Sequence, residues 1–380
     1  MFSSSCIAAL SLLVCTGLAS PFERVKALKP LEVEWAATIT FGGEDVLVIR
    51  NTGSSDTWLV QQGFQCVDIN GTDIAEADCY FGPTYNGTFT EGEIANENFN
   101  ITYGDGEFLS GVVGYTDISI GNITVTHQEV ALATKAYWEG DGMTSGLIGL
   151  AYSSLTDAFA GDNATIDNPN VTGIAPGDQD PYSPVVQRMI AQGLNPPLFT
   201  LALERSSDLD ENVPGGYVAF GGLPPVSGTT GPFYSILPDG YVYKNNASVI
   251  TTYPTTYDAI VDSGTTLLYV PTAVASGYIA SFEPPAVVYE GDYYCPCNAT
   301  APYFGIEIAG ETFNISSADI ILPDSGFVSN ATGIEYCLIG VLDGGSGADG
   351  LTIFGDVFLK NVVAVFDVGA SILRFAQHTY

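Results

Sequence analysis

Short segments rich in apolar, β-branched and aromatic residues, separated by glycine and polar turn residues, follow one another along most of the chain. This pattern predicts β-strands joined by tight turns. Two short helices are expected at 182–192 and 271–280, and the polar stretch 161–180 predicts a surface loop. Composition agrees, because 43 glycines, 21 tyrosines and 20 phenylalanines stand beside only 10 lysines and arginines in 380 residues. The predicted strands include residues 35–42, 99–106, 116–125, 198–204, 215–222 and 363–376.

The chain also contains an internal repeat. Residues 47–60 (LVIRNTGSSDTWLV) and 259–271 (AIVDSGTTLLYVP) each join two apolar strands by a turn of Asn or Asp, hydroxyl residues and glycine. The glycine permits a tight turn, and the hydroxyls can bond the turn backbone. Each copy has a later companion of two apolar residues before a glycine, at 147–149 (LIG) and 353–355 (IFG). The turns lie 211 residues apart and the companions 206, so that order and spacing are both kept.

The repeat predicts two similar lobes. A pseudo-twofold axis between them would place the two turns face to face, so we expect Asn51 and Asp262 at hydrogen-bonding distance across the floor of a cleft. The charged stretch 205–213 has no apolar run and marks the boundary between the lobes. We divide the chain into a signal peptide (1–19), a short N-terminal segment (20–32), an N-terminal lobe (33–208) and a C-terminal lobe (209–380).

Six motifs, in this order and spacing, resemble those of the pepsin-like aspartic endopeptidases, particularly the secreted fungal members. The resemblance runs from about Val33 to the C-terminus. It implies a mostly β, bilobal pepsin-like acid protease fold, with two pseudo-twofold-related β-rich lobes and a central cleft. The motifs are NTGSSDTW (51–58), ITYGDG (101–106), SGLIGLAY (145–152), VAFGG (218–222), VDSGTT (261–266) and IFGDVFLKNVVAVFD (353–367).

The resemblance also implies roles for individual residues. Asp262 matches the catalytic aspartate of the second lobe, and Asn51 occupies the position of the first. The residues implied to contact substrate are Tyr103, Gly104 and Asp105 of a mobile flap, Leu147 in the pocket before the scissile bond, and Thr265. The supporting residues are Thr52 and Ser263, which brace the two turns, Ser54 beside the first turn, and Trp58, which positions Tyr103.

The chemistry of this family needs two carboxyl groups that share one proton, because like charges about 3 Å apart cannot both ionise. The charged oxygen accepts a proton from a trapped water that attacks the peptide carbonyl, and the protonated partner hydrogen-bonds the developing oxyanion. Asn51 has nearly the volume of Asp, but its amide cannot carry a proton. Arg50 is a second departure, because the family usually has an apolar residue here and a charge must be paired or solvated. Only about a dozen residues separate the expected signal cut from Leu31, so we expect the long inhibitory prosegment usual in the family to be missing.

Two classes of function remain. In the first, the protein is an acid endopeptidase, with catalysis impaired by Asn51. In the second, it is a non-catalytic homologue that binds peptides in its cleft. Serine and cysteine catalysis fit poorly, because the chain has no G-x-S-x-G motif and His127 lies outside every motif. A sugar-binding wall protein has no positive signal in the sequence.

The N-terminus predicts secretion. The apolar run Ile7–Val14 is too short to span a bilayer, and the small residues Gly17 and Ala19 suit a signal cut after Ala19. Ten glycosylation sequons agree with this, and we expect an extracellular or secretory-pathway glycoprotein that is a monomer. The sequons lie at Asn70, Asn86, Asn100, Asn122, Asn163, Asn170, Asn246, Asn298, Asn314 and Asn330.

Five cysteines remain after the signal peptide, so one thiol is left over. Cys66 and Cys79 would close a short loop worth about 3 kcal/mol. Cys337 is expected to pair with either Cys295 or Cys297. Zinc is the competing interpretation of the Cys-Pro-Cys motif, but the chain has only two histidines, and we expect neither a metal nor a cofactor.

The formal net charge of −33 at pH 7 narrows the range of partners. Phosphate backbones and anionic membranes would repel such a chain, so we expect no nucleic acid and no membrane partner. The acidic residues are scattered singly, which suits either a solvated surface or adaptation to acidic surroundings. A peptide or protein in the cleft remains the expected partner.

Overall fold

The computed structural model describes most of the chain. The expected signal peptide, the proposed lobe boundary after residue 208, and the sequons at Asn170, Asn246 and Asn330 lie outside the described residues. The described residues are 22–28, 34–164, 179–203, 214–222, 234–244, 250–255, 257–289, 291–329, 332–346 and 350–378.

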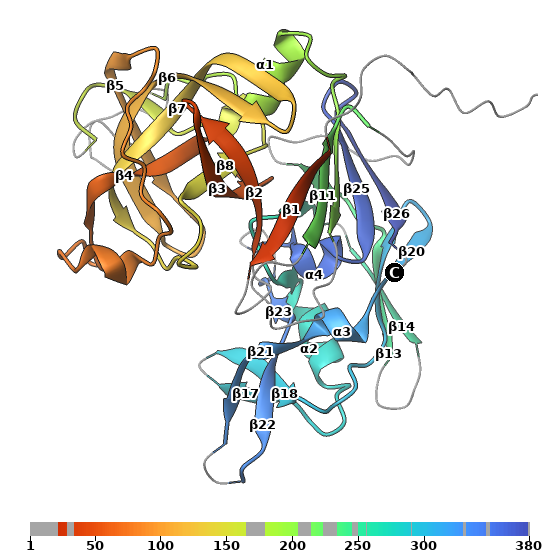
Figure 1. Cartoon of the computed structure of the whole chain (residues 1–380). Coiled ribbons are helices and arrows are strands. Elements are labelled where there is room, and N and C mark those ends of the chain that lie inside the picture. Colours follow the sequence, from red (N-terminus) through yellow and green to blue (C-terminus); the bar gives the residue numbers. More distant parts are fainter. Residues whose placement is uncertain are drawn as a thin grey trace, which may run out of the picture.

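The fold is mostly β, with two lobes, as the sequence predicted (Figure 1). Strands of the first lobe belong to a 13-stranded sheet, ordered β26-β25-β10-β11-β1-β2-β3-β8-β4-β7-β6-β5-β9. Its strands are β1 (Phe22–Leu28), β2 (Glu34–Phe41), β3 (Glu44–Asn51), β4 (Thr57–Cys66), β5 (Glu93–Thr102), β6 (Phe108–Ile120), β7 (Ile123–Tyr137), β8 (Gly146–Gly149), β9 (Ala158–Ala160), β10 (Phe199–Leu203), β11 (Pro214–Phe220), β25 (Val362–Asp367) and β26 (Ile372–Gln377).

Three smaller sheets build the second lobe, in the orders β12-β15-β24-β16-β23, β14-β13-β19-β20 and β17-β18-β22-β21. Their strands are β12 (Ser235–Ile236), β13 (Gly240–Lys244), β14 (Ile250–Pro254), β15 (Ala259–Val261), β16 (Leu268–Val270), β17 (Val287–Tyr289), β18 (Asp292–Pro296), β19 (Phe304–Ile308), β20 (Glu311–Ile315), β21 (Ile321–Val328), β22 (Glu335–Ile339), β23 (Val341–Asp343) and β24 (Ile353–Phe354).

The internal repeat of the sequence is a repeat of strand pairing. In the first lobe β8 pairs parallel with β3 and antiparallel with β4. In the second lobe β24 pairs parallel with β15 and antiparallel with β16. Each companion strand therefore lies between the two strands that flank its turn, which fixes the direction in which that turn leaves the sheet.

Strands from distant parts of the chain meet between the lobes. In Figure 1, β1, β11, β25 and β26 lie side by side between the strands of the first lobe and the lower part of the second. β10 pairs with both β11 and β25, and Phe199 of β10 stacks on Phe366 of β25 with ring centroids 4.6 Å apart. The sequence did not predict β1 or this shared layer, because pairing between remote strands leaves no local signal.

Both predicted helices are present. α1 (Val185–Ala191) begins after Pro184, and α2 (Thr272–Ile279) begins after Pro271; each proline is the N-cap residue, with the φ near −60° that its ring imposes. The short helices were missed, since single turns carry too few residues for a periodic pattern. They are α3 (Ser317–Ile320), α4 (Asp356–Leu359) and the 3₁₀ turns η1 (Glu76–Cys79) and η2 (Ser153–Leu155).

Three strand predictions had wrong ends. The segment 363–376 is divided into β25 and β26 by a turn at residues 368–371. The other two end or divide at a glycine. The segment 99–106 stops being a strand at Thr102, and the next four residues form a turn in which Gly106 has φ +97°. The segment 116–125 spans two strands, β6 and β7, which reverse at Gly121 with φ +57°. In both cases a glycine supplies the left-handed conformation that the turn requires.

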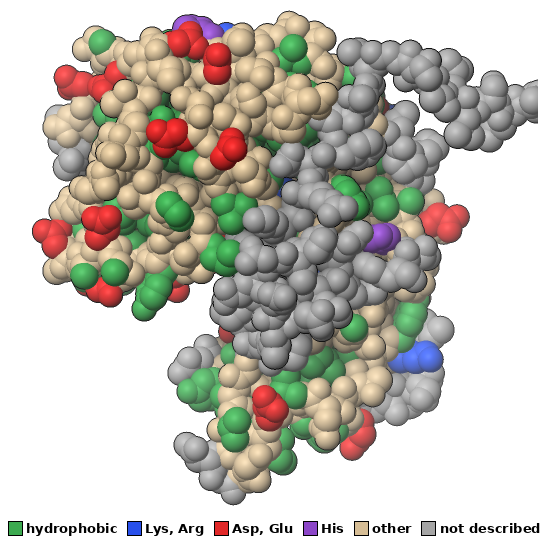
Figure 2. Space-filling view, viewed as in Figure 1, with side chains coloured by type: hydrophobic (Ala, Val, Ile, Leu, Met, Phe, Trp, Pro, Cys, Tyr) green, Lys and Arg blue, Asp and Glu red, His purple; other side chains and the backbone are tan. Residues whose placement is uncertain are grey.

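Acidic side chains lie singly over the face of the molecule in Figure 2, and few Lys or Arg side chains accompany them there. This distribution fits the net charge of −33. Among the described residues, no helix combines the length and the apolar character needed to cross a membrane.

Candidate active site in the cleft

The two repeated turns hold Asn51 and Asp262 in matching ways. Asn51 ends β3, and its Oδ1 accepts the N–H of Gly53 at 2.5 Å and of Ser54 at 3.2 Å. Asp262 follows β15, and its Oδ1 accepts the N–H of Gly264 at 2.8 Å. Each side chain is therefore oriented by the backbone of its own turn.

The turns are also bonded to each other. Thr52 Oγ1 donates to the carbonyl of Val261 at 3.0 Å and accepts the N–H of Ser263 at 2.9 Å. Ser263 Oγ donates to the carbonyl of Arg50 at 3.2 Å. Thr52 and Ser263 thus brace one lobe against the other, in the arrangement that the resemblance implied.

A glycine in each turn lies against the Asn51 or Asp262 side chain of the other turn. Because glycine has no side chain, the two turns can approach closely. A Cβ on Gly264 would lie 2.4 Å from Asn51 Nδ2, and a Cβ on Gly53 would lie 2.6 Å from the Asp262 carboxyl. Both side chains line the floor of one cavity of about 580 Å³. Within the described residues no hydrogen bond joins the two side chains directly, contrary to the contact that the repeat predicted. The Asp262 carboxyl instead accepts a hydrogen bond from the backbone of Gly53 in the opposite turn.

Burial sets the electrostatics of Asp262. It raises the pKa of the Asp262 carboxyl, while the hydrogen bonds from Gly264 N–H and from Thr265 Oγ1, at 2.8 Å, lower it. A partly buried carboxyl of this kind holds a proton to higher pH than a fully exposed aspartate. Thr265, expected to contact substrate, both lines the cavity and bonds the Asp262 carboxyl.

The flap is the hairpin between β5 and β6. Tyr103 N–H donates to Glu107 O at 2.8 Å, which closes the hairpin. Trp58 Nε1 donates to Tyr103 OH at 2.9 Å, and this fixes the tyrosine over the cavity. Tyr103, Gly104 and Asp105 all line the cavity, as expected from the motif.

Leu147 does not line the cavity, contrary to its expected role in a substrate pocket. It is 2% exposed, pairs with Trp58 between β8 and β4, and belongs to the core beneath the flap. The motif predicted the strand correctly, but it could not show whether the Leu147 side chain faces the cleft or the core.

Several lining residues were missed. On the flap side, Glu107 accepts the N–H of Glu139 at 2.6 Å, and burial raises the pKa of the Glu107 carboxyl to about 8. Thr266 and Leu267 directly follow the second turn and could have been found from it, whereas β21 and β22 are remote in sequence and gave no signal. The missed lining residues are Glu107, Tyr137, Glu139, Gly264, Thr266, Leu267, Tyr269, Leu322, Leu338, Leu351 and Ile353.

Arg50 is buried beneath the first turn, with 1% of its surface exposed. Burial lowers the pKa of Arg50 to about 10, and the nearby Asp356 charge opposes this. Asp356 begins α4 in the second lobe, and its N–H donates to Thr265 O at 2.8 Å. The Asp356 charge therefore offsets only part of the effect of burial, and the guanidinium nitrogens of Arg50 are buried without a hydrogen-bond partner among the described residues.

Sulfur positions decide the cysteine pairing. Cys66 and Cys79 are bonded at 2.04 Å, as predicted. Cys337 is bonded to Cys297 at 2.01 Å, and Cys295 is a buried free thiol. Of the two partners left open for Cys337, the structure therefore selects Cys297.

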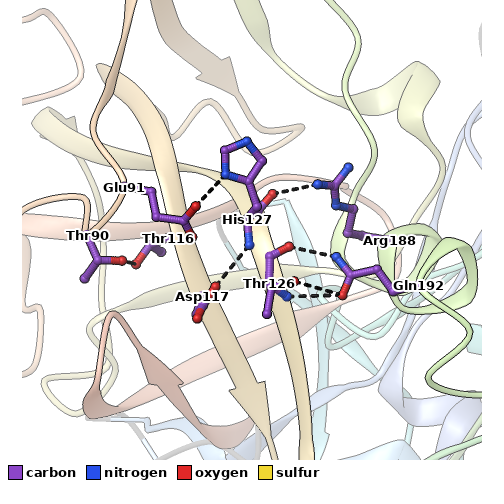
Figure 3. A network of polar contacts seen from close by, with 8 residues as sticks. All are labelled: Thr90, Glu91, Thr116, Asp117, Thr126, His127, Arg188 and Gln192. Carbon is purple, nitrogen blue, oxygen red and sulfur yellow. Dashed lines mark hydrogen bonds and ion pairs between the residues drawn. The ribbon is translucent and has the colours of Figure 1, made fainter.

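His127 lies away from the cleft, in the polar network of Figure 3. Its Nδ1 lies 2.6 Å from Glu91 Oε2, and its carbonyl accepts a bond from Arg188 at 3.1 Å. The network joins β7 to α1, and the residues drawn in Figure 3 include no serine or cysteine that His127 could activate. Among the described residues, no group of three or more His, Cys, Asp or Glu side chains could hold a metal ion.

Comparison with known proteins agrees with this geometry. A family model for the eukaryotic aspartyl protease matches residues 34–378. A probable aspartic-type endopeptidase of Aspergillus fumigatus is 39% identical over 365 residues, covering 90% of this chain and 78% of that protein. Endothiapepsin of Cryphonectria parasitica is 31% identical over 336 residues, covering 83% and 68%.

A solved structure gives the same result for the fold. The crystal structure of an aspartic proteinase from Irpex lacteus superposes with a TM-score of 0.71 at 19% identity, covering 95% of this chain and 98% of that one. Together with two repeated turns that meet at the floor of one cleft, these matches show that the chain belongs to the pepsin-like family of eukaryotic aspartyl proteases.

Proposed function

We propose that the protein is a secreted aspartic endopeptidase homologue that binds peptides in its cleft at acidic pH and cleaves them poorly. The observation that carries this proposal is the composition of the cleft floor. An amide, Asn51, and a carboxyl, Asp262, stand at the two matching turn positions. The fold itself implies a peptide in the cleft, and the amide accounts for the impaired chemistry.

Hydrolysis of a peptide bond here needs a base for the attacking water and an acid for the carbonyl oxygen. Asp262 can fill one of these roles in a given step, and its raised pKa suits proton transfer in acid. Asn51 Oδ1 is held by two backbone N–H groups, and its Nδ2 can donate a hydrogen bond but no proton. Loss of one acid–base partner reduces the rate by about 10²–10⁴-fold.

Peptide binding rests on groups that do not include the missing carboxyl. The flap backbone at Gly104 and Asp105 lines the cavity, and Trp58 holds Tyr103 in place. Apolar side chains of the second lobe, Leu351 and Ile353, line the opposite wall. These contacts depend on shape and burial rather than on proton transfer, so binding survives the change at Asn51.

A non-catalytic peptide-binding role is the second candidate, and Asn51 favours it too. The two candidates differ in residual acid cleavage, which is absent in the second. In either case we propose lobes at 33–208 and 209–380, a signal peptide at 1–19, and an extracellular, glycosylated monomer.

Binding is tested with a peptide-like inhibitor that carries a hydroxyl at the scissile carbon, added to the Asn51 protein at pH 4. We expect a higher melting temperature, because a ligand that binds only the folded state stabilises it by about 2.7 kcal/mol at 100 times its Kd. The matched Asn51→Asp variant should shift further, because the hydroxyl then meets two carboxyl groups. The absence of a shift in both proteins contradicts a peptide-binding cleft.

A further inference from the structure

One wall of the cleft continues beyond the cavity along the sheet β17-β18-β22-β21. Leu322 and Leu338, which both line the cavity, are register partners on β21 and β22. Tyr294 lies opposite Leu338 on β18, and Tyr336 lies two residues before Leu338 on its own strand. Since side chains two residues apart, and direct register partners, share a face of a sheet, these tyrosines lie on the cleft face.

Four aromatic rings cover this face where it leaves the cavity, and we call them the aromatic face. Phe327 is the register partner of Tyr336 and contacts Tyr289, Tyr294 and Tyr336, with ring centroids 4.7, 5.2 and 5.3 Å apart. Tyr289, at the outer end, is 47% exposed. β17, β18 and β22 project from the lower end of the molecule in Figure 1. The exposure of Tyr289 shows that solvent reaches the outer end of this face.

The outer hairpin also lies within electrostatic reach of the cavity. Tyr269 lines the cavity, and its pKa is raised by burial and then by the charges of Asp292 and Asp105. Asp292 is the register partner of Tyr289 on the β17–β18 hairpin. The carboxyl group of Asp292 on the hairpin and that of the flap residue Asp105 therefore both lie near Tyr269.

We infer that the aromatic face is a second binding surface for the peptide chain that occupies the cleft, and that it accepts an extended apolar segment of that chain. This inference rests on the proposed function. Continuity with the cleft identifies the occupant, because an extended peptide leaving Leu338 runs directly onto the rings. At about 3.3 Å per residue, Tyr336 is reached about two residues beyond Leu338. Exposed aromatic residues favour apolar partners, and the charge of −33 disfavours anionic ones.

The test measures the affinity of the Asn51 protein for inhibitor peptides at pH 4. The probes are a hexapeptide inhibitor with a hydroxyl at the scissile carbon, and the same inhibitor extended at either end by Phe-Val-Phe-Leu or by Ser-Gly-Ser-Gly. We expect the apolar extension at one end to lower Kd by about tenfold or more relative to the polar extension. Isothermal titration gives each Kd.

Two double variants assign this gain to the aromatic face. Tyr289→Ser with Phe327→Ser removes two rings, and we expect the advantage of the apolar extension to fall to less than threefold. Val288→Ser with Val328→Ser is the matched control, because these neighbours are 66% and 61% exposed and point to the opposite face. The control should keep the full advantage, and circular dichroism checks that both variants are folded.

Other outcomes overturn the inference. Equal affinity for the two extensions, or equal loss in both double variants, shows that the rings do not bind peptide. A dimer that disappears in the Tyr289/Phe327 variant assigns the face to a second copy instead, and selective binding to insoluble glucan assigns it to a polysaccharide. If the hexapeptide inhibitor itself fails to bind, the proposed function fails together with the inference, whereas binding without any gain refutes the inference alone.

Discussion

Asp56 provides a quantitative test of the buried carboxyl groups in the first lobe. It is fully buried, and burial, followed by the charge of Asp157, raises the pKa of its carboxyl from 3.8 to about 8. Hydrogen bonds from Tyr182 OH at 2.7 Å and from the N–H of Asp157 at 3.0 Å act in the opposite direction. The folded protein therefore binds a proton at Asp56 that the unfolded chain releases above pH 4.

The sign of the pH dependence follows from this difference. Stability from a group with a raised folded pKa is fully present below the unfolded value of 3.8 and is lost as pH rises through about 8. Each pKa unit corresponds to about 1.4 kcal/mol, so between pH 4 and pH 7 the Asp56 carboxyl removes about 4 kcal/mol from the free energy of unfolding. Asp56→Asn keeps the shape of the side chain and abolishes this titration.

Urea unfolding at pH 4, 5, 6 and 7 measures the effect. We expect Asp56→Asn to match the parent protein within about 1 kcal/mol at pH 4 and to be more stable by about 4 kcal/mol at pH 7. The exposed Asp78→Asn variant is the control for the loss of one acidic side chain at the surface. A difference between parent and Asp56→Asn that stays constant or shrinks as pH rises refutes the reasoning.

Three further results are expected. Replacing Cys66 and Cys79 together by serine should cost about 3 kcal/mol in urea unfolding, and an unchanged midpoint contradicts the value assigned to their loop. Gly53→Ala should lower the melting temperature strongly and weaken inhibitor binding, because its Cβ would lie 2.6 Å from the Asp262 carboxyl; normal binding and stability would show that the turns do not approach as described. Asn122, exposed at the turn between β6 and β7, should carry a glycan in a secreting host, and mass spectrometry of an unmodified Asn122 peptide contradicts this.

The sequence predicted the centre of the fold well, because the fold repeats itself there. Two copies of one turn, each with a later companion strand, were enough to place Asn51 and Asp262 in one cavity. The glycine and hydroxyl residues of those turns favour a turn through local interactions, so the turns can be predicted from neighbouring residues alone. The Cys66–Cys79 bond was predictable for the same reason, since both cysteines belong to one short loop.

Features that depend on packing between remote segments were not predictable. The electrostatic influence of Asp356 on Arg50 joins residues more than 300 positions apart in different lobes. Leu147 shows the same limit, because its motif gives a strand but not the neighbours of each side chain. Leu322 and Leu338 reach the cavity only through the pairing of β21 with β22.

The central claim concerns proton transfer at the cleft floor, and acid cleavage tests it most directly. An unfolded protein substrate is incubated at pH 3–5 with the Asn51 protein and, in parallel, with Asn51→Asp, and the products are quantified by mass spectrometry. Asp262→Asn in the Asn51→Asp background leaves a single carboxyl, at position 51. Its cleavage rate is the baseline for one carboxyl in the first turn alone. We expect Asn51→Asp to cleave at least about 10²–10⁴-fold faster than the Asn51 protein. Equal and rapid cleavage by the Asn51 protein, with deamidation of Asn51 excluded by its mass, contradicts the account.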